Sequence, residues 1–194
     1  MNKDNDDKYL YQKLIICVIG LPGAGKSVFC SVSNELGFSV INMGDQIRKK
    51  IKKQGLSDDA KTLSEMMIKL RKENGRSAVA EICTPIIKKS QNKYIIIDGI
   101  RNIEEIKQFQ KIGQVISILI TNTTERRMNF LIERGRNDAP LDKKTFKKRD
   151  KNEINIGLNQ VMKMADIIID NNELTKEEFK TKSKEILLKL IKSD

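Results

Sequence analysis

The sequence predicts an α/β fold in which helices cover both faces of a five-stranded parallel sheet. Five short apolar runs lack the polar–apolar alternation of half-exposed strands, which is typical of strands buried on both faces. Segments with helical periodicity separate successive runs, as the crossover connections of a parallel sheet require. The chain has 194 residues, a length that suits one α/β domain with a sizeable core.

The apolar runs place the expected strands at residues 14–19, 38–43, 93–97, 115–121 and 166–170. Helices are expected from the end of a glycine-rich turn to residue 36, over 44–54, from 57 or 58 to 74, over 77–89, 102–111 and 124–134, in one or two segments up to 164, and over 175–191. Pro85 is expected to kink the helix that contains it. Thr175 and Glu178 have the spacing of a capping box.

The same pattern predicts the domain organisation. We expect residues 1–11 to form a disordered polar tail and residues 12–194 to form a single domain. Two inserts interrupt the regular alternation: a helical stretch at about 44–90 and an arginine-rich lid at about 134–150. We expect both inserts to be mobile parts of the one domain.

Composition excludes several classes of function. With 39% hydrophobic and 32% charged residues, the chain is not expected to be disordered. It has no histidine, which excludes histidine-based triads, and its three cysteines lack the spacing of a zinc ribbon. The apolar runs are too short to cross a membrane, and the polar N-terminus does not resemble a signal peptide. A cytoplasmic protein without membrane contact is therefore expected.

The charge indicates an anionic partner. Lysine and arginine number 37 against 26 aspartates and glutamates, a formal net charge of +11, and the excess is spread along the chain. Many lysines lie at helical spacing, where they form solvated faces. Only 5% of residues are aromatic, so there is no evident platform for stacking nucleic-acid bases. The pattern favours an anionic small molecule over nucleic acid.

The strongest motif follows the first apolar run and matches the G-x-x-x-x-G-K-[ST] phosphate loop. Its residues are Gly20, Leu21, Pro22, Gly23, Ala24, Gly25, Lys26 and Ser27. Glycines let backbone N–H groups surround a phosphate, and the following helix presents its positive N-terminus to the same anion. Lys26 is expected to reach the β- and γ-phosphates and the Ser27 hydroxyl to bind Mg²⁺. ATP and Mg²⁺ are thus the predicted cofactors.

Asp98 is the second candidate, because it ends the third apolar run. A carboxylate at the carboxyl end of a central parallel strand faces the ligand crevice, where it can hold Mg²⁺ directly or through water. The alternative is that Asp98 caps the next helix.

Two strand-end segments resemble the acceptor site of adenylate kinases. Gly44, Asp45 and Arg48 resemble a Gly-Asp-x-x-Arg segment that opens the monophosphate-binding helices. Gly99 and Arg101, directly after Asp98, resemble an Asp-Gly-(x)-x-Arg turn, with one residue fewer and no proline. Both arginines offer fork-shaped cations that can hold a phosphate through two bonds.

The arginine-rich lid segment also resembles adenylate kinases. Arg136, Asn137 and Asp138, with Arg149 further on, resemble the Arg-x-Asp-Asp…Arg pattern of adenylate-kinase lids, although Ala139 replaces the second aspartate. The cations expected to neutralise the transferring phosphoryl group and to exclude water are Arg127, Arg134, Arg136 and Arg149. Some of them could instead pair with surface carboxylates.

Together these motifs resemble the archaeal adenylate-kinase-related proteins, a P-loop family near nucleoside monophosphate kinases and dephospho-coenzyme A kinases. The resemblance covers the chain from about residue 13 to its C-terminus. It implies a P-loop NTPase three-layer sandwich with strand order 2-3-1-4-5 and a kinase that binds ATP and a phosphorylated small-molecule acceptor.

The residues leave the acceptor open but favour AMP. A nucleoside monophosphate is already anionic, so its phosphorylation requires cations and Mg²⁺ but no general base. A hydroxyl acceptor, as in dephospho-coenzyme A, benefits from a carboxylate base. Asp45 lies where dephospho-coenzyme A kinases carry one, but Met43 replaces the other aspartate of their pattern.

Two functions other than small-molecule phosphorylation are compatible with a phosphate loop: an RNA-related factor and a GTPase switch. A nucleotide-dependent RNA or ribosome-assembly factor on the same fold is an alternative that the positive charge supports. A GTPase switch is disfavoured, because no Asn-Lys-x-Asp motif is present.

Overall fold

The computed structural model of the chain describes residues 13–57, 59–134 and 142–193. Its centre is a five-stranded, all-parallel sheet in the order β2-β3-β1-β4-β5. The strands are β1 (Leu14–Ile19), β2 (Ser39–Asn42), β3 (Tyr94–Asp98), β4 (Gln114–Thr121) and β5 (Ile167–Asp170). The predicted fold class and strand order are confirmed.

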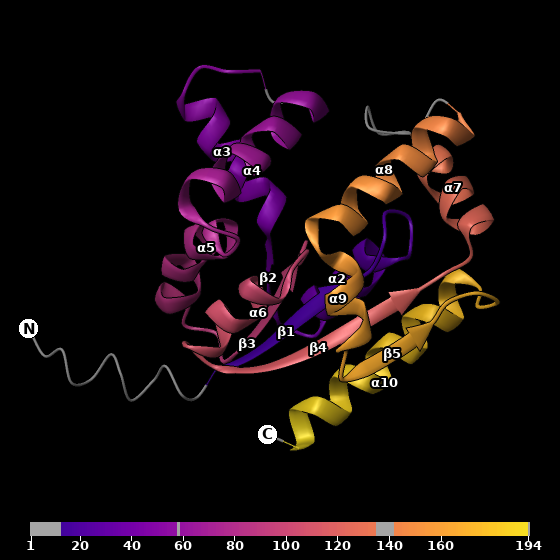
Figure 1. Cartoon of the computed structure of the whole chain (residues 1–194). Helices are drawn as coiled ribbons and strands as arrows, with labels where there is room; N and C mark the ends of the chain where they lie inside the picture. The colour runs from indigo at the N-terminus through magenta and orange to yellow at the C-terminus, as the bar shows by residue number, and fades with distance from the viewer. Residues whose placement is uncertain (1–12, 58, 135–141, 194) are drawn as a thin grey trace, which may run out of the picture.

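Nine helices connect or flank the strands in the described ranges (Figure 1). They are α2 (Lys26–Glu35), α3 (Met43–Lys53), α4 (Ala60–Asn74), α5 (Ala78–Lys89), α6 (Ile103–Gln110), α7 (Thr124–Glu133), α8 (Lys143–Ile156), α9 (Leu158–Lys163) and α10 (Lys176–Ser193). None of the helices in these ranges is long and apolar enough to cross a membrane.

Two hydrophobic cores lie on opposite faces of the sheet because successive strand residues point to opposite sides. In β1, Ile15, Cys17 and Ile19 join the core formed with α3, α5, α6 and α9. Leu14, Ile16 and Val18 join the core formed with α2 and α10. All six residues of β1 are fully buried, which explains why its sequence shows no alternation.

Two helical arms rise beyond the carboxyl ends of the strands (Figure 1). One arm consists of α3 and α4 and begins directly after β2, and α5 leads from it back to the sheet, against which it packs. The other consists of α7 and α8 and begins after β4. The glycine-rich turn between β1 and α2 lies at the same edge of the sheet, because β1 is parallel to both strands. In the sequence, α3 to α5 overlap the insert expected at about 44–90, and α7 and α8 adjoin or overlap the lid expected at about 134–150. We name the two arms the acceptor arm and the lid arm after these expectations.

Several element boundaries differ from expectation, and side-chain caps explain the differences. Asn42 caps α3 by accepting a hydrogen bond from the Asp45 N–H (3.0 Å), so Met43 begins the helix instead of ending the strand. Asp59, not Ser57 or Asp58, caps α4 through the Thr62 N–H (2.8 Å).

Other local predictions agree with the structure. Helix α5 includes Pro85 and ends at Lys89, as expected, and the kink at Pro85 stays a prediction. Thr175 and Glu178 form the expected capping box, in which the Glu178 carboxylate accepts a bond from the Thr175 N–H (2.8 Å). Cys17 and Cys83 are buried, as small hydrophobic residues would be, and Cys30 is half-buried. The expected tail, residues 1–11, lies outside the described ranges.

Candidate active site at the carboxyl edge of the sheet

The phosphate loop connects β1 to α2 and requires glycine at two tightly packed positions. Gly23 and Gly25 have φ angles of 82° and 117°, a conformation that residues with a Cβ rarely adopt. A Cβ on Gly23 would overlap the backbone carbonyl of Arg127, and one on Gly25 would lie 2.8 Å from Asn171 Nδ2. The loop is thus shaped by packing against α7 and the β5–α10 turn.

Lys26 folds back over this loop. Its Nζ donates hydrogen bonds to the backbone carbonyls of Gly20 (2.7 Å) and Leu21 (3.1 Å). Burial lowers the pKa of Lys26, and the nearby carboxylates of Asp98 and Glu153 act in the opposite direction. The Ser27 side chain is exposed in the first turn of α2. A bound polyphosphate would replace the two carbonyls as the partner of the ammonium group.

Asp98 ends β3 beside the phosphate loop. Its Oδ2 accepts a hydrogen bond from Asn42 Nδ2 (2.8 Å), whereas its buried Oδ1 has no hydrogen-bond partner among the residues that the structure describes. The Asp98 charge acts on both Lys26 and Cys30, so the carboxylate faces the first turns of α2, which include Ser27. The cap of the next helix is Asn102 instead, through the Glu105 N–H (3.0 Å).

A buried carboxylate oxygen without a hydrogen-bond partner among the described residues, near the start of the helix that carries the Ser27 hydroxyl, fits Mg²⁺, which prefers oxygen ligands. Within the described part of the chain, no group of three or more His, Cys, Asp and Glu residues could hold a metal ion. A Mg²⁺ ion in a nucleotide site is bound by one or two side chains, with substrate phosphates and water completing its shell. Asp98 and Ser27 are the residues that would hold it.

The acceptor arm places its candidate residues in the first two turns of α3. Gly44 is buried there, and a Cβ on it would lie 3.0 Å from Asn42 Oδ1. Arg48 Nη1 lies 2.9 Å from Asp45 Oδ1, and both side chains are exposed. Asn42 connects this helix to Asp98, because its amide binds the Asp98 carboxylate and its oxygen caps α3.

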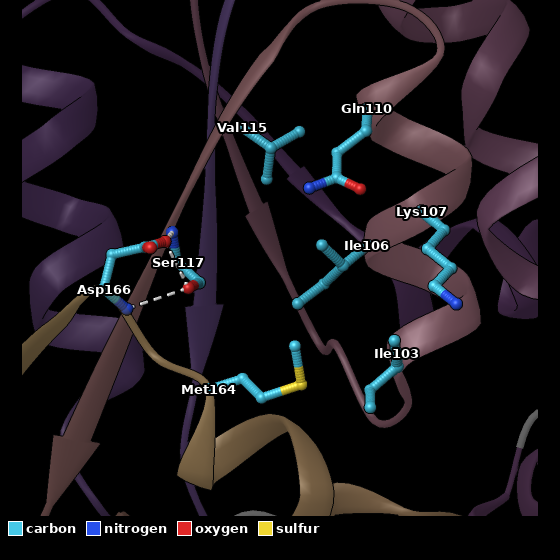
Figure 2. A pocket seen from close by; sticks show the side chains of 8 residues that line it. All are labelled: Ile103, Ile106, Lys107, Gln110, Val115, Ser117, Met164 and Asp166. Carbon is cyan, nitrogen blue, oxygen red and sulfur yellow. Dashed lines mark hydrogen bonds between the residues drawn. The ribbon is translucent and has the colours of Figure 1, made fainter.

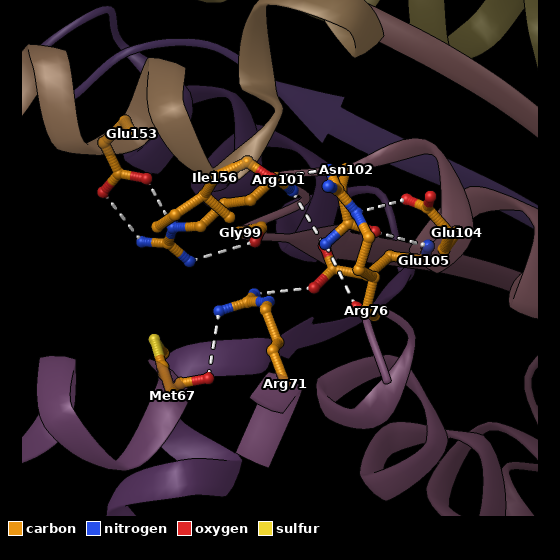
Figure 3. A network of polar contacts seen from close by, with 10 residues as sticks. All are labelled: Met67, Arg71, Arg76, Gly99, Arg101, Asn102, Glu104, Glu105, Glu153 and Ile156. Carbon is orange, nitrogen blue, oxygen red and sulfur yellow. Dashed lines mark hydrogen bonds and ion pairs between the residues drawn. The ribbon is translucent and has the colours of Figure 1, made fainter. Parts of the chain in front are cut away.

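Arg101 lies in the β3–α6 turn and is bound by a carboxylate from the lid arm (Figure 3). Its Nε and Nη2 lie 2.5 and 3.1 Å from the two carboxylate oxygens of Glu153 in α8, and its Nη1 donates to the Gly99 carbonyl (3.1 Å). Burial alone would lower the pKa of Arg101, but Glu153 outweighs this effect and raises it above the ordinary value. Burial likewise opposes ionisation of Glu153, yet Arg101, Lys26 and Arg149 together lower the Glu153 pKa.

Arg127 connects the phosphate loop to the lid arm. Its side chain is only 3% exposed, and its guanidinium binds both carboxylate oxygens of Asp150 (3.0 and 2.5 Å) and the Pro22 carbonyl (3.0 Å). It also lies over the ring of Phe146, 4.8 Å from its centroid. Arg127 is therefore paired with a carboxylate, which was the alternative to a role at the transferring phosphoryl group. It also contacts the phosphate loop.

The remaining lid arginines lie at different depths. Arg134 is half-buried at the end of α7, and Arg149 is half-buried in α8 with its charge close to Glu153. Arg136 lies outside the described residues. The structure therefore brings Lys26, Arg101 and Arg149 close to Glu153 and places Asp98 close to Lys26 and Arg101. Arg127 lies at the loop and Arg48 on the acceptor arm.

Three residues of this site were absent from the prediction. Asn42 is the bridge described above, and Asn171, 3% exposed, donates to the Ala24 carbonyl of the loop (3.0 Å). Both asparagines lie where an apolar run ends, so the strand-end rule that identified Asp98 could have found them. Glu153 had no such signal, because it lies in a lysine-rich helical segment far from any strand end.

A separate pocket of about 180 Å³ lies between α6, β4 and the α9–β5 connection (Figure 2). Isoleucine, valine and methionine side chains line it, together with Lys107, Gln110, Ser117 and Asp166. Asp166 Oδ2 accepts bonds from the N–H and hydroxyl of Ser117 (2.8 and 2.6 Å), which connects the start of β5 to β4. None of the candidate site residues lines this pocket.

Comparisons with known proteins agree with this architecture. Residues 19–147 match a family described as an AAA domain. The chain is 33% identical to a UPF0200 protein of Hyperthermus butylicus, over 92% of this chain and 95% of that protein. It is 36% identical to one of Sulfurisphaera tokodaii, over 91% and 97%.

Solved structures show the same fold at low sequence identity. A shikimate kinase from Acinetobacter baumannii, in complex with shikimate, matches with a TM-score of 0.58 and 13% identity over 94% of this chain and 97% of that chain. A shikimate kinase from Bacteroides thetaiotaomicron matches with a TM-score of 0.61 and 14% identity, over 92% and 98%. By its relatives and its P-loop kinase-like fold, the chain belongs to the UPF0200 family.

Proposed function

We propose that this protein is an ATP-dependent phosphotransferase that transfers the γ-phosphoryl group of ATP to a nucleoside monophosphate of the AMP type, with Mg²⁺. The observation that carries the proposal is the cluster at the carboxyl edge of the sheet. There the phosphate-loop Lys26 and the fork of Arg101 lie close to Glu153, and the charge of Asp98, whose Oδ1 has no hydrogen-bond partner among the described residues, acts on both cations.

Each residue of the cluster has a role in this reaction. The loop N–H groups and the N-terminus of α2 bind the polyphosphate, and Lys26 moves from the loop carbonyls to its outer phosphates. Mg²⁺ held near Asp98 and Ser27 supplies charge neutralisation on the transferring group. Arg101 and Arg48 orient the acceptor, and the lid arginines shield the transfer from water.

A monophosphate acceptor fits this set of groups because its nucleophilic oxygen needs no general base. Cations and positioning are sufficient for such a transfer, and the cluster supplies both. The second candidate is a hydroxyl acceptor, which the shikimate-bound structural neighbour favours. For this acceptor Asp45 would be the base, although Arg48 binds its carboxylate in the structure.

The test is an acceptor screen with ATP and Mg²⁺ in which ADP formation is measured. The acceptors are AMP, other nucleoside monophosphates, dephospho-coenzyme A and shikimate. We expect rapid ADP formation with a monophosphate and slow ADP formation without an acceptor. A rate that depends on dephospho-coenzyme A or shikimate instead would replace AMP with a hydroxyl acceptor.

Substitution of Lys26 tests whether the ADP formation measured in the screen depends on the phosphate loop. Lys26→Ala should lower turnover by about 100-fold or more, because a positioned charge at the transferring phosphates is lost. Lys88→Ala is the matched control, since Lys88 is exposed in the last turn of α5. Equal turnover in the Lys26→Ala variant would contradict the assignment of the loop.

A further inference from the structure

Helix α8 is attached to the rest of the molecule largely through arginines. Of its fourteen residues, Phe146 is buried, whereas the next helix, α9, buries Leu158 and Val161 in the core. Arg127 binds Asp150 and Arg101 binds Glu153. Arg76 donates to the carbonyl of Ile156 at the helix end (2.8 Å). The contacts that hold α8 in place therefore include two ion pairs that an anion can replace.

The contact at Arg101 has the geometry of ligand recognition. Two N–H groups of one guanidinium edge bind two oxygens of one carboxylate, the arrangement by which arginine binds phosphates and carboxylates of ligands. Both side chains are largely buried, with 22% of Arg101 and 14% of Glu153 exposed. Glu153 thus occupies the edge of Arg101 that an acceptor's oxyanion would use.

The cation is fixed to the sheet, and the carboxylate comes from another element (Figure 3). The Arg101 backbone N–H donates to Glu105 Oε2 (2.8 Å), and Glu105 is fully buried. Arg71 from α4 binds the other oxygen of Glu105 at 2.7 Å. Arg101 also holds the Gly99 carbonyl. The Arg101 backbone is thus held by α6, and its guanidinium keeps one bond to Gly99 when Glu153 leaves, so we expect an exchange of partners to proceed mainly by movement of Glu153.

Charge makes the two partners mutually exclusive. Glu153 is close enough to Lys26 to affect its pKa, so this carboxylate lies among the cations that face the phosphate loop. An oxyanion on the same edge of Arg101 would meet a second anion in a largely buried site, where like charges repel strongly. Glu153 and the acceptor cannot both occupy that edge.

We propose that Glu153 holds the place of the acceptor's oxyanion on Arg101, and that the acceptor binds by displacing it. The inference rests on the proposed phosphotransfer and narrows its acceptor to a compound with a phosphate or carboxylate group. The released α8 can then move about Gly157, which joins it to α9 with a φ of 123°.

The test measures binding of AMP to the nucleotide-free protein by calorimetry. Glu153→Gln keeps the size of the side chain but removes the competing charge, so the dissociation constant for AMP should fall about tenfold, equivalent to about 1.4 kcal/mol. Glu104→Gln is the matched control, because Glu104 forms a comparable ion pair with Arg76 (3.1 Å) in the same network but at the surface. It should bind AMP like the wild type.

A purely structural role of Glu153 makes the opposite prediction. If Glu153 only positioned Arg101, the Glu153→Gln variant would bind AMP more weakly than the wild type does. The gain must also depend on Arg101, so adding Glu153→Gln to Arg101→Ala should bring no further gain. A parallel titration with shikimate distinguishes a carboxylate acceptor from a phosphate acceptor, and a gain with neither compound overturns the proposal.

Two further measurements keep the result interpretable. Thermal unfolding shows whether Glu153→Gln is folded; if it is not, Glu153→Asp, whose shorter side chain weakens the two-bond contact, should show a smaller gain in AMP affinity. Binding of ATP is measured in the same proteins. A wild type that does not bind ATP contradicts the proposed function, whereas normal ATP binding with no gain in affinity for either AMP or shikimate contradicts only the role of Glu153.

Discussion

Lys26, Arg101 and Arg127 each have a partner within the chain at the candidate site. Lys26 binds loop carbonyls, Arg101 binds Glu153 and Arg127 binds Asp150. These partners offset the cost of burying positive charge in the absence of substrate. A polyphosphate must therefore replace existing contacts, which favours ligands that present several oxyanions at once.

Asp98 is the exception, because its buried Oδ1 lacks a hydrogen-bond partner in the described part of the chain. Asp98→Asn should lower kcat by about 100-fold and raise the Mg²⁺ concentration needed for half-maximal rate, since a metal-binding charge is lost. An asparagine can still accept the bond from Asn42, so thermal unfolding should change little. Turnover at several Mg²⁺ concentrations is the measurement.

Asp170→Asn is the control for this substitution. Asp170 also ends a parallel strand, but β5 is at the sheet edge and the Asp170 side chain is exposed. We expect wild-type turnover and Mg²⁺ dependence from this variant. If Asp98→Asn and Asp170→Asn behave alike, Asp98 is not the metal-binding residue.

At the scale of secondary structure, the sequence predicted the sheet and its loop better than the helical arms. Strand β1 could be recognised because full burial on both faces removes alternation, and the glycine spacing after it has a direct physical cause in phosphate binding. Helix boundaries were less accurate where neighbouring residues competed as caps. Ser57 donates to Asp59 (2.8 Å), and Asp59 then caps α4.

The role of α8 could not be predicted from local patterns. Its sequence is rich in lysine and indicates a solvated helix, yet Asp150 and Glu153 contact arginines distant in the chain. Arg101 and Glu153 are 52 positions apart, and nothing local to either residue indicates the pair. Such long-range ion pairs depend on how the arms pack, which the sequence pattern does not describe.

The attachment of α8 has a predictable dependence on pH. The pKa of Glu153 in the folded protein lies below its ordinary value of 4.5, so the Arg101–Glu153 pair stabilises the fold fully above that value. The contribution is lost as the pH falls through the lowered pKa. At pH 7, Glu153→Gln should reduce the free energy of unfolding by about 3 kcal/mol, the cost of leaving a buried partner unpaired.

Urea unfolding of both proteins over a pH series checks this prediction. The difference between wild type and Glu153→Gln should narrow below about pH 4.5, where protonated Glu153 becomes as neutral as glutamine. Glu104→Gln, whose ion pair is exposed, should differ little from the wild type at any pH. A difference for Glu153→Gln that stays constant with pH would mean that its ionisation does not contribute to stability.

At the scale of the whole molecule, the two arms lie on either side of the carboxyl edge of the sheet (Figure 1). The net charge of +11 adds a long-range attraction for anions to the local contacts of the site. This attraction serves a kinase, whose substrates are both anionic, but it also suits the alternative of an RNA-related factor. Exposed lysines of α8, at positions 143, 144, 147, 148 and 151, form the lid arm's share of this charge.

Salt dependence separates the two functions. Non-specific RNA binding through many phosphate contacts weakens by about 10³ or more between roughly 50 and 200 mM salt, because it is driven by release of counterions. We expect this protein to bind a single-stranded RNA weakly at the lower salt concentration. The binding, measured by fluorescence anisotropy, should disappear at the higher one. RNA should not accelerate ADP formation, whereas the correct small-molecule acceptor should. RNA binding that persists at the higher salt concentration and stimulates ATP hydrolysis without an acceptor would favour the RNA-related factor. In a small-molecule kinase, nucleic acid should not induce closure of the lid.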